Sequence, residues 1–463
     1  MQLLFNPRSI AVIGATRDLT RAGSLPIFFL RKHGYTGKIF PVNPNYRKVS
    51  GLPCYPSPAA IPEEVDLALI GIPRQGVMGA LRDCAEKKIR YAILFSAGFA
   101  ETGAAGRSEQ EALLRVARES GIRLVGPNCI GMVNTHGHVA ASFTSGLDID
   151  SLLTGSVGLI TQSGGIGNCL LTRAHDRGIG FSYFVSSGNE ADLEVSDFLE
   201  FMIDDGQTQA IALLIESLRN PTRFAAVARR ALQAGKAIVA LKAGWSAAGQ
   251  KATASHTGAL TSADGLYEGL FRQLGISRVF DIDDLLEAAN LFACCLPPQG
   301  NRLAVLTTSG GSGALLADLA SNHHLQLPAP SQHTRERLRE FTPAVTAIAN
   351  PMDMTGQFIH ELDVLEHYLR TFAEDESYDI VVVNFTFSPP ESALKVAERI
   401  AALAPSLAKP LIVCWPVGEA TRPAFACLEK ARVPLFFHPS RCLSALGHFV
   451  RFGMRRYTAD LHP

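Results

Sequence analysis

The chain has 463 residues, 47% of them hydrophobic and 19% charged, which indicates an ordered globular protein with room for about three domains of roughly 150 residues. Its 43 lysines and arginines balance 43 aspartates and glutamates, so the composition excludes the basic footprint of a protein that binds nucleic acid or an anionic membrane. The sequence shows no secretory leader, no apolar run of about 18 residues and no Cys-x-x-Cys among its nine cysteines, so we expect a cytoplasmic protein without a membrane span or disulfide framework, whose partners are small molecules or protein.

Three stretches of the chain share one pattern, in which a β-branched apolar run leads through a glycine-bearing turn into an amphipathic helix. They begin at Ile10, Val157 and Leu303. Strand and helix patterns then alternate, which is typical of parallel α/β sheets. Further strands of the first unit are predicted at Gly37–Val42, Leu67–Ile70, Tyr91–Phe95 and Arg123–Gly126.

The pattern lapses twice, in the polar stretch from Ser142 to Gly155 and again from Leu296 to Asn301. These two breaks predict three domains of Rossmann-like or flavodoxin-like α/β fold. We expect them to cover residues 1–145, 150–296 and 300–463.

A glycine turn ends the first predicted strand. The backbone N–H groups after Gly14 could hold a pyrophosphate at a helix N-terminus. A dinucleotide site would need Gly-x-Gly-x-x-Gly and an acid after the second strand, whereas Thr16 takes the third position and Asn43 follows the second strand. The sequence therefore disfavours NAD but predicts a cofactor-binding turn made of Gly14, Ala15, Thr16, Arg17, Asn43 and Pro44.

Other turns of the first unit are predicted at the same edge of its sheet. Open α/β folds bind ligands at the carboxyl ends of their strands. The alternative is that these turns only terminate strands. The candidate residues are Ile72, Pro73, Ser96, Ala97, Gly98, Asn128 and Cys129, the last two within the turn Gly126–Gly131.

A single histidine lies in a run of small residues that begins at Gly244. His256 has no second histidine or cysteine nearby with the spacing of a metal site. An imidazole nitrogen can attack a phosphoryl group and carry it as phosphohistidine. We therefore expect a nucleophile on a mobile loop. Two alternatives remain, a solvated or capping histidine and an alanine-rich helix packed in place.

Seven motifs, taken in their order and spacing, carry a resemblance. Through these motifs the chain resembles the α subunit of the nucleoside-diphosphate-forming (ADP-forming) acyl-CoA synthetases, in the superfamily of succinyl-CoA synthetase. The resemblance extends along essentially the whole chain. The motifs are Val12-Ile13-Gly14-Ala15, Val42-Asn43-Pro44, Gly126–Gly131, Thr161-Gln162-Ser163-Gly164-Gly165, Ser187-Gly188-Asn189, Ser255-His256-Thr257-Gly258-Ala259 and Asn350-Pro351-Met352-Asp353.

This resemblance implies that the first, Rossmann-like domain binds CoA at the Gly14 turn and that two flavodoxin-like domains follow it. It also implies that His256 is the phosphorylated histidine and that Glu216, at the end of a strand, faces it. A carboxylate that accepts a hydrogen bond from one ring nitrogen fixes the tautomer and leaves the other nitrogen free to attack. The alternative for Glu216 is a solvated carboxylate at the edge of the sheet.

The resemblance further implies that phosphate binds at helix N-termini, where unpaired N–H groups converge. One such terminus contains Ser163, Gly164 and Gly165. The second is expected in the third domain, between Asn384 and Glu391, with Ser388 as the binding residue. Prolines 389 and 390 in that segment have no N–H to donate, which lowers its number of donors.

The implied reaction converts acyl-CoA and phosphate to acyl phosphate and CoA, and then passes the phosphoryl group through His256 to a nucleotide. CoA and inorganic phosphate would bind this chain, whereas ADP/ATP or GDP/GTP with Mg would bind a separate ATP-grasp β subunit, because we find no such module and no metal site in the sequence. A non-catalytic CoA-binding or regulatory module of the same fold is the alternative. The carboxylic acid stays open between acetate, longer or branched aliphatic acids and aryl acids.

Overall fold

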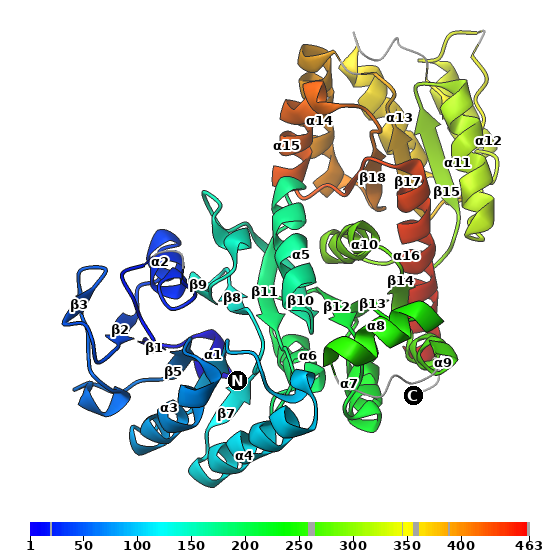
Figure 1. Cartoon of the computed structure of the whole chain (residues 1–463). Coiled ribbons are helices and arrows are strands. Elements are labelled where there is room, and N and C mark those ends of the chain that lie inside the picture. Colours follow the sequence, from blue (N-terminus) through cyan, green and yellow to red (C-terminus); the bar gives the residue numbers. More distant parts are fainter. Residues whose placement is uncertain (19–20, 258–263, 345, 355–360, 388, 461–463) are drawn as a thin grey trace. The chain divides into compact units, whose positions relative to one another are not determined.

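A computed structural model of the chain describes residues 1–18, 21–257, 264–344, 346–354, 361–387 and 389–460, and only the backbone of 253–257 and 458–460. It contains three sheets built on the same plan (Figure 1). In each set of parallel strands, the strand that comes first in the sequence lies between the second and the third. Later strands are therefore added on both sides of the first strand. Such a reversal of strand order opens a crevice at the carboxyl ends of the two central strands.

The first sheet confirms the strands predicted for the first unit, each within one or two residues. All five strands are parallel, in the order β2-β1-β5-β6-β7. A small hairpin, β3 (Lys48–Val49) and β4 (Leu52–Pro53), stands apart from them. The strands are β1 (Ser9–Ile13), β2 (Lys38–Val42), β5 (Leu67–Ile70), β6 (Tyr91–Leu94) and β7 (Arg123–Val125).

Both faces of this sheet are buried, which explains why its strands are continuous apolar runs. Ile10 and Val12 pack toward α2, whereas Ala11 and Ile13 pack toward α3 and α4 on the opposite face (Figure 1). The helical segments of this part are α1 (Gln2–Phe5), α2 (Leu25–Lys32), α3 (Arg74–Glu86), α4 (Ala104–Ser120), η1 (Pro58–Ala60) and η2 (Ala100–Thr102).

The second sheet has seven strands in the order β14-β13-β12-β10-β11-β8-β9. Its last two strands form an antiparallel hairpin that follows the first sheet in sequence and pairs with β11. The strands are β8 (Gly131–Asn134), β9 (Val139–Ser142), β10 (Thr154–Thr161), β11 (Phe181–Ser186), β12 (Ala210–Ile215), β13 (Ala237–Lys242) and β14 (Ser277–Val279). The helical segments are η3 (Ser145–Leu147), α5 (Gly164–Asp176), α6 (Val195–Asp204), α7 (Pro221–Gln233), α8 (Ala247–Thr257) and α9 (Asp264–Leu274). Helix α10 (Ile282–Cys294) follows and spans the boundary between the two compact units of the chain, at Leu285.

Helix α8 corrects one expectation. The run from Gly244 to His256 was predicted to be a loop, but it is helical from Ala247 onward. The Ser246 hydroxyl accepts a hydrogen bond from the Gly249 amide at 3.1 Å, and the Ser246 carbonyl accepts one from Gln250 at 2.7 Å. A serine cap followed by alanines, the best helix formers, outweighs the flexibility that a glycine contributes.

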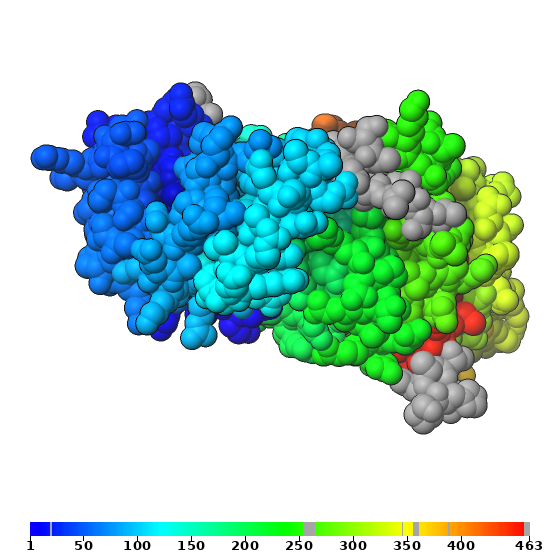
Figure 2. Space-filling view, turned by 60° about the horizontal axis from the view of Figure 1, so that its bottom comes forward, coloured from blue at the N-terminus to red at the C-terminus, as the bar shows by residue number. Residues whose placement is uncertain are grey.

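The first two sheets belong to one compact unit, Met1–Leu285. One hydrophobic cluster runs through both, from Ile10 and Leu67 to Phe198 and Leu213. Figure 2 shows the cyan part of the surface, which belongs to the end of the first sheet and its helices, directly against the green part of the second. Asp192 also links them, because its carboxylate accepts hydrogen bonds from Arg123 Nε at 2.7 Å and from the Leu124 amide at 3.0 Å.

The third sheet lies in the second compact unit, Leu286–Pro463, and its five parallel strands are ordered β16-β15-β17-β18-β19. None of the described helices combines the length and the apolar character needed to cross a bilayer. The strands are β15 (Leu303–Thr307), β16 (Met352–Asp353), β17 (Ile380–Asn384), β18 (Leu411–Cys414) and β19 (Leu435–Phe436). The helical segments are α11 (Gly310–Asn322), α12 (Gln332–Arg339), α13 (Leu362–Glu374), α14 (Pro390–Leu403), η5 (Ala404–Ser406), η6 (Glu419–Thr421), α15 (Arg422–Lys430) and α16 (Pro439–Asp460).

Replacement of Asp192 tests the link between the first two sheets. In Asp192→Ala the Leu124 amide loses its acceptor, and the Arg123 guanidinium keeps only the Asp197 carboxylate, at 3.8 Å. We expect the free energy of unfolding to fall by about 1–3 kcal/mol, because an unpaired buried donor costs that much. Urea unfolding followed by circular dichroism measures it. Asp176→Ala, whose side chain is 81% exposed, is the control and should stay within about 0.5 kcal/mol of the wild type. Equal losses in the two variants would contradict the role of Asp192.

Candidate active site

The Gly14 turn lies at the carboxyl end of β1, where the strand order of the first sheet reverses. Its φ of +88° and its approach to the Gly71 carbonyl, 2.6 Å from where a Cβ would lie, restrict the position to glycine. The amides of Gly14 and Ala15 donate to the Val42 carbonyl, and Asn43 Nδ2 donates to the Ala15 carbonyl at 2.8 Å. These residues thus shape the turn, and Ala15 does not offer the free amide that the sequence led us to expect.

The other predicted residues of the first domain continue this edge in strand order. Arg17 donates to the Lys48 carbonyl at 3.1 Å, and its guanidinium lies 5.3 Å from the Tyr46 ring centre. Ser96 Oγ donates to the Ile72 carbonyl at 2.5 Å, and the Ser96 carbonyl accepts the Asn128 amide at 3.0 Å. The structure therefore brings the predicted cofactor-binding residues together along one sheet edge.

Cys129 lies on the same turn as Asn128 but faces inward. Its side chain is buried, and its thiol lies 3.4 Å from the Leu94 carbonyl. Burial raises the pKa of Cys129 to about 12, so the thiol stays protonated. This cysteine packs the base of the turn and is not a nucleophile.

The loop between β11 and α6 is hydrogen-bonded to the turn that follows β7, and so connects the second sheet to the first. The amides of Asn189 and Ala191 donate to the carbonyls of Pro127 and Gly126, both at 2.9 Å. A Cβ at Gly188 would come within 2.4 Å of the Pro127 carbonyl, so only glycine allows this approach. The motif Ser187-Gly188-Asn189 thereby joins the carboxyl edges of the two sheets.

Gln162 holds the crevice of the second sheet together. Its Oε1 accepts hydrogen bonds from the amides of Glu216 and Ser217 at 2.6 and 3.0 Å, and its Nε2 donates to the Ser217 carbonyl at 2.8 Å. These bonds connect the ends of β10 and β12. Gln162 was not among the predicted site residues, although its place at the end of the first strand of the second sheet was the available signal.

The predicted phosphate turn forms the start of α5. Ser163 caps the helix by accepting a hydrogen bond from the Ile166 amide at 3.4 Å, and Gly164 and Gly165 are its first two residues. Thr161 Oγ1 accepts the Ser163 amide at 3.1 Å. The helix is 13 residues long, so its N-terminal N–H groups and dipole favour an anion at this turn.

The third sheet has the same kind of turn at the start of α11. Ser309 accepts a hydrogen bond from the Ser312 amide at 3.5 Å, and Thr307 Oγ1 accepts the Ser309 amide at 3.2 Å. The likeness of Thr307-Thr308-Ser309-Gly310-Gly311 to Thr161–Gly165 was a visible signal that our prediction for the third domain did not use.

The segment that we did predict there, before α14, lies at the end of the neighbouring strand β17. Thr308 and Thr386 hydroxyls are 2.9 Å apart, so this segment meets the α11 turn in the crevice of the third sheet. Ser388 lies outside the described residues. Helix α14 begins at Pro390 with Pro389 as its N-cap and has no side-chain cap.

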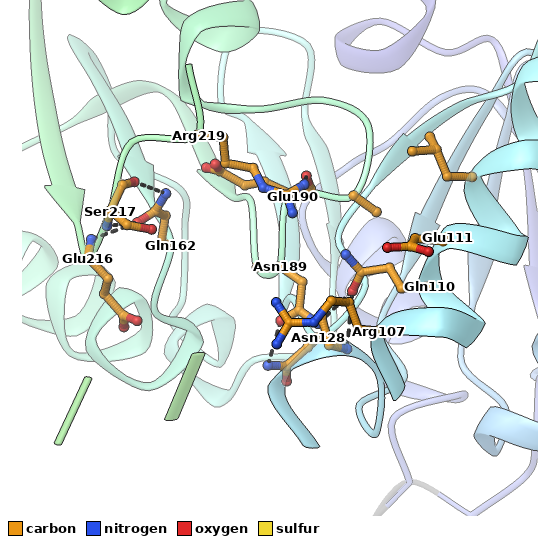
Figure 3. A pocket seen from close by; sticks show the side chains of 14 residues that line it. Arg107, Gln110, Glu111, Asn128, Gln162, Asn189, Glu190, Glu216, Ser217 and Arg219 are labelled. Carbon is orange, nitrogen blue, oxygen red and sulfur yellow. Dashed lines mark hydrogen bonds between the residues drawn. The ribbon is translucent and has the colours of Figure 1, made fainter. Parts of the chain in front are cut away.

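A cavity of about 200 Å³ opens where the first two sheets meet (Figure 3). Among the described residues, no three histidine, cysteine, aspartate or glutamate side chains cluster closely enough to hold a metal ion. The cavity is lined by Ala100, Arg107, Gln110, Glu111, Leu114, Asn128, Gln162, Gly188, Asn189, Glu190, Ala191, Glu216, Ser217 and Arg219.

Glu190 is the more deeply buried of two buried carboxyls that line this cavity. It is 2% exposed, its backbone has φ +53°, and its Oε1 accepts a hydrogen bond from Ser187 Oγ at 2.8 Å. Arg219 donates to its carbonyl oxygen. Burial raises the pKa of Glu190 to about 7, against the opposing effect of hydrogen bonds from Gln162 and Ser187. Glu190 was not predicted, because nothing in the sequence marks a glutamate as buried.

Glu101 is a second carboxyl missed by the sequence, and it supports the cavity from the first domain. It accepts hydrogen bonds from Asn189 at 2.5 Å and from the amides of Gly98 and Phe99 at 2.5 and 3.1 Å. Burial alone would raise the pKa of Glu101, but these hydrogen bonds lower it overall. Glu101 therefore stays ionised and holds the two loops together.

Glu216 lies at the end of β12 and is 8% exposed, which contradicts the alternative of a solvated carboxylate. Figure 3 shows it beside Gln162 and Ser217 on the wall of the cavity. His256 belongs to α8, and its side chain lies outside the described residues. Helix α8 runs beside η2, whose Ala100 lines the cavity. The backbone of the histidine helix is therefore adjacent to the site that contains Glu216.

Comparisons with known proteins agree with this arrangement. Residues 8–135 match the model of a CoA binding domain, and residues 154–292 match that of a succinyl-CoA ligase like flavodoxin domain. The chain is 36% identical to the α subunit of acetate–CoA ligase [ADP-forming] II of Pyrococcus furiosus, covering 96% of each chain. It is 35% identical to acetate–CoA ligase [ADP-forming] I of Archaeoglobus fulgidus, covering 98% of this chain but only 64% of that protein.

A solved structure resembles the whole chain. It is the dinucleotide forming acetyl-coenzyme A synthetase 1 of Ca. Korarchaeum cryptofilum, in complex with phosphate and ADP. The two structures superpose with a TM-score of 0.91 at 30% sequence identity, over 100% of this chain and 99% of that chain. The predicted fold class, a Rossmann-like CoA-binding domain followed by flavodoxin-like domains, is thereby confirmed. The chain belongs to the family of ADP-forming acyl-CoA ligases, in which it corresponds to the α subunit.

Proposed function

We propose that this chain is the α subunit of an acid–CoA ligase that interconverts acyl-CoA, phosphate and a nucleoside diphosphate with a carboxylic acid, CoA and a nucleoside triphosphate. One observation carries the proposal: Asn128 of the predicted CoA edge and Glu216 line a single cavity, and the phosphate turn directly follows Gln162, which lines it too. A module that only bound CoA would not need a buried carboxylate or a phosphate turn beside it.

The residues at the edge of the first sheet suit CoA. The thirteen candidates include a glycine turn, amide and hydroxyl groups and the cation Arg17, but no acidic side chain that would repel the phosphates of CoA. Bound CoA supplies the thiol that carries the acyl group. We propose that the row formed by Gly14, Ile72, Ser96 and Asn128 directs this thiol toward the cavity.

We propose that inorganic phosphate binds at the start of α5, where Ser163, Gly164 and Gly165 present the helix N-terminus. Attack of a phosphate oxygen on the thioester carbonyl breaks the C–S bond and gives acyl phosphate and CoA. We also propose that the third sheet binds phosphate in its own crevice, at the α11 turn or near Ser388. Donors at a helix terminus would stabilise the charge on a transferring phosphoryl group.

We propose that His256 then takes the phosphoryl group from acyl phosphate and releases the carboxylate of the acid. Glu216 accepts a hydrogen bond from one imidazole nitrogen, so that the other nitrogen is unprotonated and attacks phosphorus. Burial of Glu216 supports this role, because a buried carboxylate orients its partner more firmly than a solvated one.

A separate subunit would complete the cycle. The relative from Archaeoglobus fulgidus is longer than this chain by about a third of its own length. We propose that an ATP-grasp β subunit supplies this part and binds ADP/ATP or GDP/GTP with Mg, and that the enzyme works in the cytoplasm, where these substrates are made. Co-expression with an ATP-grasp subunit from the same genome, followed by CoA-thioester assays with acetate, longer aliphatic acids and aryl acids, identifies the acid and nucleotide.

Labelling tests the phosphohistidine. We expect ³²P-phosphate and acetyl-CoA to label the co-expressed protein with a bond that is stable in base and labile in acid, as a phosphoramidate is. His256→Ala should abolish the label. His136→Ala, at an exposed histidine bonded to the Gly155 carbonyl, is the control and should label as the wild type does. Label that persists in His256→Ala would contradict the assignment of His256 as the phosphorylated residue.

Glu216→Gln tests the orienting carboxylate. The amide is nearly isosteric, so the protein should fold and bind CoA normally while single-turnover labelling of His256 slows by about 10²–10⁴-fold. Rapid-quench kinetics measures the rate, and Glu119→Gln, an exposed change on α4, controls for the loss of one charge. An unchanged labelling rate would reduce Glu216 to a structural residue.

The raised pKa of Glu190 has a place in this scheme. Phosphate enters a cavity that already contains the carboxyls of Glu190 and Glu216. With its pKa near 7, Glu190 can take up a proton and give up its charge as the anion binds. An ionised Glu190 would otherwise add its negative charge to those of Glu111 and Glu216, which also line the cavity, and weaken phosphate binding.

Glu190→Gln tests this pKa through stability. Because the folded state holds the proton more tightly than the unfolded state, Glu190 lowers the free energy of unfolding as pH rises from about 4.5 to about 7, and the full cost of about 3 kcal/mol remains above that range. The variant has no charge to bury. We therefore expect it to gain stability relative to the wild type between pH 5 and pH 8 in urea titrations. An identical pH dependence in both proteins would contradict the raised pKa.

A further inference from the structure

A buried amide that has no role in the scheme above lines the cavity from α4. Gln110 is 5% exposed, and its Oε1 accepts hydrogen bonds from Asn189 Nδ2 at 3.0 Å and from the Ala100 amide at 3.3 Å (Figure 3). Its Nε2 donates to no group in the part of the chain that the structure describes. A buried N–H without a partner is costly, so this donor needs an explanation.

The two bonds to Oε1 determine which way the Gln110 amide points. Both partners are N–H donors, so the oxygen must face them and the NH2 group must face away from them. Asn189 is itself held, because it donates to the Glu101 carboxylate at 2.5 Å and accepts a hydrogen bond from Asn128 Nδ2 at 3.3 Å. Protein atoms do not fully enclose Gln110 Nε2, so this nitrogen is accessible from the cavity that Gln110 lines.

This donor lies on the side of the cavity where CoA is proposed to bind. Helix α4 belongs to the first sheet, and two hydrogen bonds lead from Asn128, the last residue of the proposed CoA row, through Asn189 to Gln110. The phosphate turn instead follows Gln162 in the second sheet. The placement of Gln110 therefore favours the thioester over the phosphate as the group that Nε2 contacts.

The thioester carbonyl needs such a donor in this cavity. When a phosphate oxygen bonds to the carbonyl carbon, the electron pair of the C=O double bond moves onto the carbonyl oxygen, which becomes an oxyanion. The carboxyls of Glu111, Glu190 and Glu216 line the same cavity and disfavour a further negative charge. Arg107 and Arg219 line it as well, but both are exposed, whereas Gln110 is a buried donor.

We propose that Gln110 Nε2 donates a hydrogen bond to the acyl carbonyl oxygen and is a catalytic residue for the formation of acyl phosphate. This inference rests on the proposed function. As the oxyanion collapses, its electron pair re-forms the C=O bond and the C–S bond breaks. The CoA thiolate that leaves takes the proton that hydrogen phosphate carried. An amide already held by Asn189 and Ala100 stabilises the oxyanion without having to reorient.

Gln110→Met removes the donor from a side chain of similar length. In the co-expressed complex, single-turnover labelling by ³²P-phosphate and acetyl-CoA should slow by about 10²–10³-fold, as for the loss of one oxyanion donor. The affinity for CoA, measured by calorimetry, should not change. The matched control is Gln233→Met, at the exposed C-terminal end of α7, which should keep the wild-type rate.

Gln110→Glu separates catalysis from packing. The variant keeps an oxygen for the Asn189 and Ala100 donors but places a second oxygen where the NH2 group was. If Gln110 only held its neighbours in place, this variant would label faster than Gln110→Met. We expect it to label more slowly at pH 9, where the carboxylate is ionised, because its charge repels the oxyanion.

Infrared spectroscopy tests the contact itself. A hydrogen bond to a carbonyl oxygen weakens the C=O bond, so the band of acetyl-CoA labelled with ¹³C at this carbon should move to lower wavenumber when it binds the wild-type complex. In Gln110→Met the band should move back toward that of free acetyl-CoA. A glutamine with only a packing role would leave the band the same in both proteins.

The outcomes separate this inference from the proposed function. A wild type that neither acetyl-CoA nor any other thioester of the acid panel labels would overturn the proposed function itself. In a labelled wild type, a carbonyl band that does not depend on Gln110 would overturn only this inference, and so would a Gln110→Met variant that raises the KM for phosphate alone. If Gln110→Met does not fold, a wild-type labelling rate in Gln110→Glu still overturns it.

Discussion

The reversal of strand order at the first strand of each sheet is the constraint on which the rest of the molecule depends. Parallel strands end at a common edge, and the loops that leave the two central strands must diverge to opposite faces. In the first sheet these are the loops after Gly14 and Ile70, and in the second they are those after Thr161 and Ile215. Polar and glycine residues therefore gather at these ends, whereas the strands themselves are buried on both faces. The third sheet repeats the arrangement with Thr307 and Asn384, which pair in register.

Two such crevices border one cavity because the loop after β11 closes on the turn after β7. The approach of Gly188 to Pro127 and the hydrogen bonds of Asp192 with Arg123 and Leu124 fix the two edges against each other. Glu101 supports the same contact from the first domain through Asn189. Backbone contacts thus determine the shape of the cavity. Its chemistry comes from the few carboxyl and amide side chains that line it.

Much of this was predictable from the sequence. The strands of the first sheet and the glycine turns after β1 and β10 followed from apolar runs and from residues with restricted backbone choices, because such signals are local. What could not be predicted depends on partners distant in sequence. Burial of Glu190 and Glu216, and the bonds of Gln162 to the Glu216 loop, arise only when β10 and β12 lie side by side. The helical state of residues 247–257 was expected only as the alternative to a loop, since small residues favour both flexible loops and helices, and the Ser246 cap decides between them.

The hairpin of β8 and β9 has a practical consequence for dividing the protein. It follows directly after the turn that contains Asn128, yet its hydrogen bonds are to β11. A fragment that stopped near residue 145 would keep this hairpin and lose the strand it pairs with, leaving the unsatisfied edge of β8 and the apolar side chains of Met132 and Val133 in contact with solvent. Exposed edges of this kind recruit strands from other molecules. An isolated CoA-binding fragment cut there would tend to aggregate, whereas one cut before the hairpin would leave its five-stranded sheet complete.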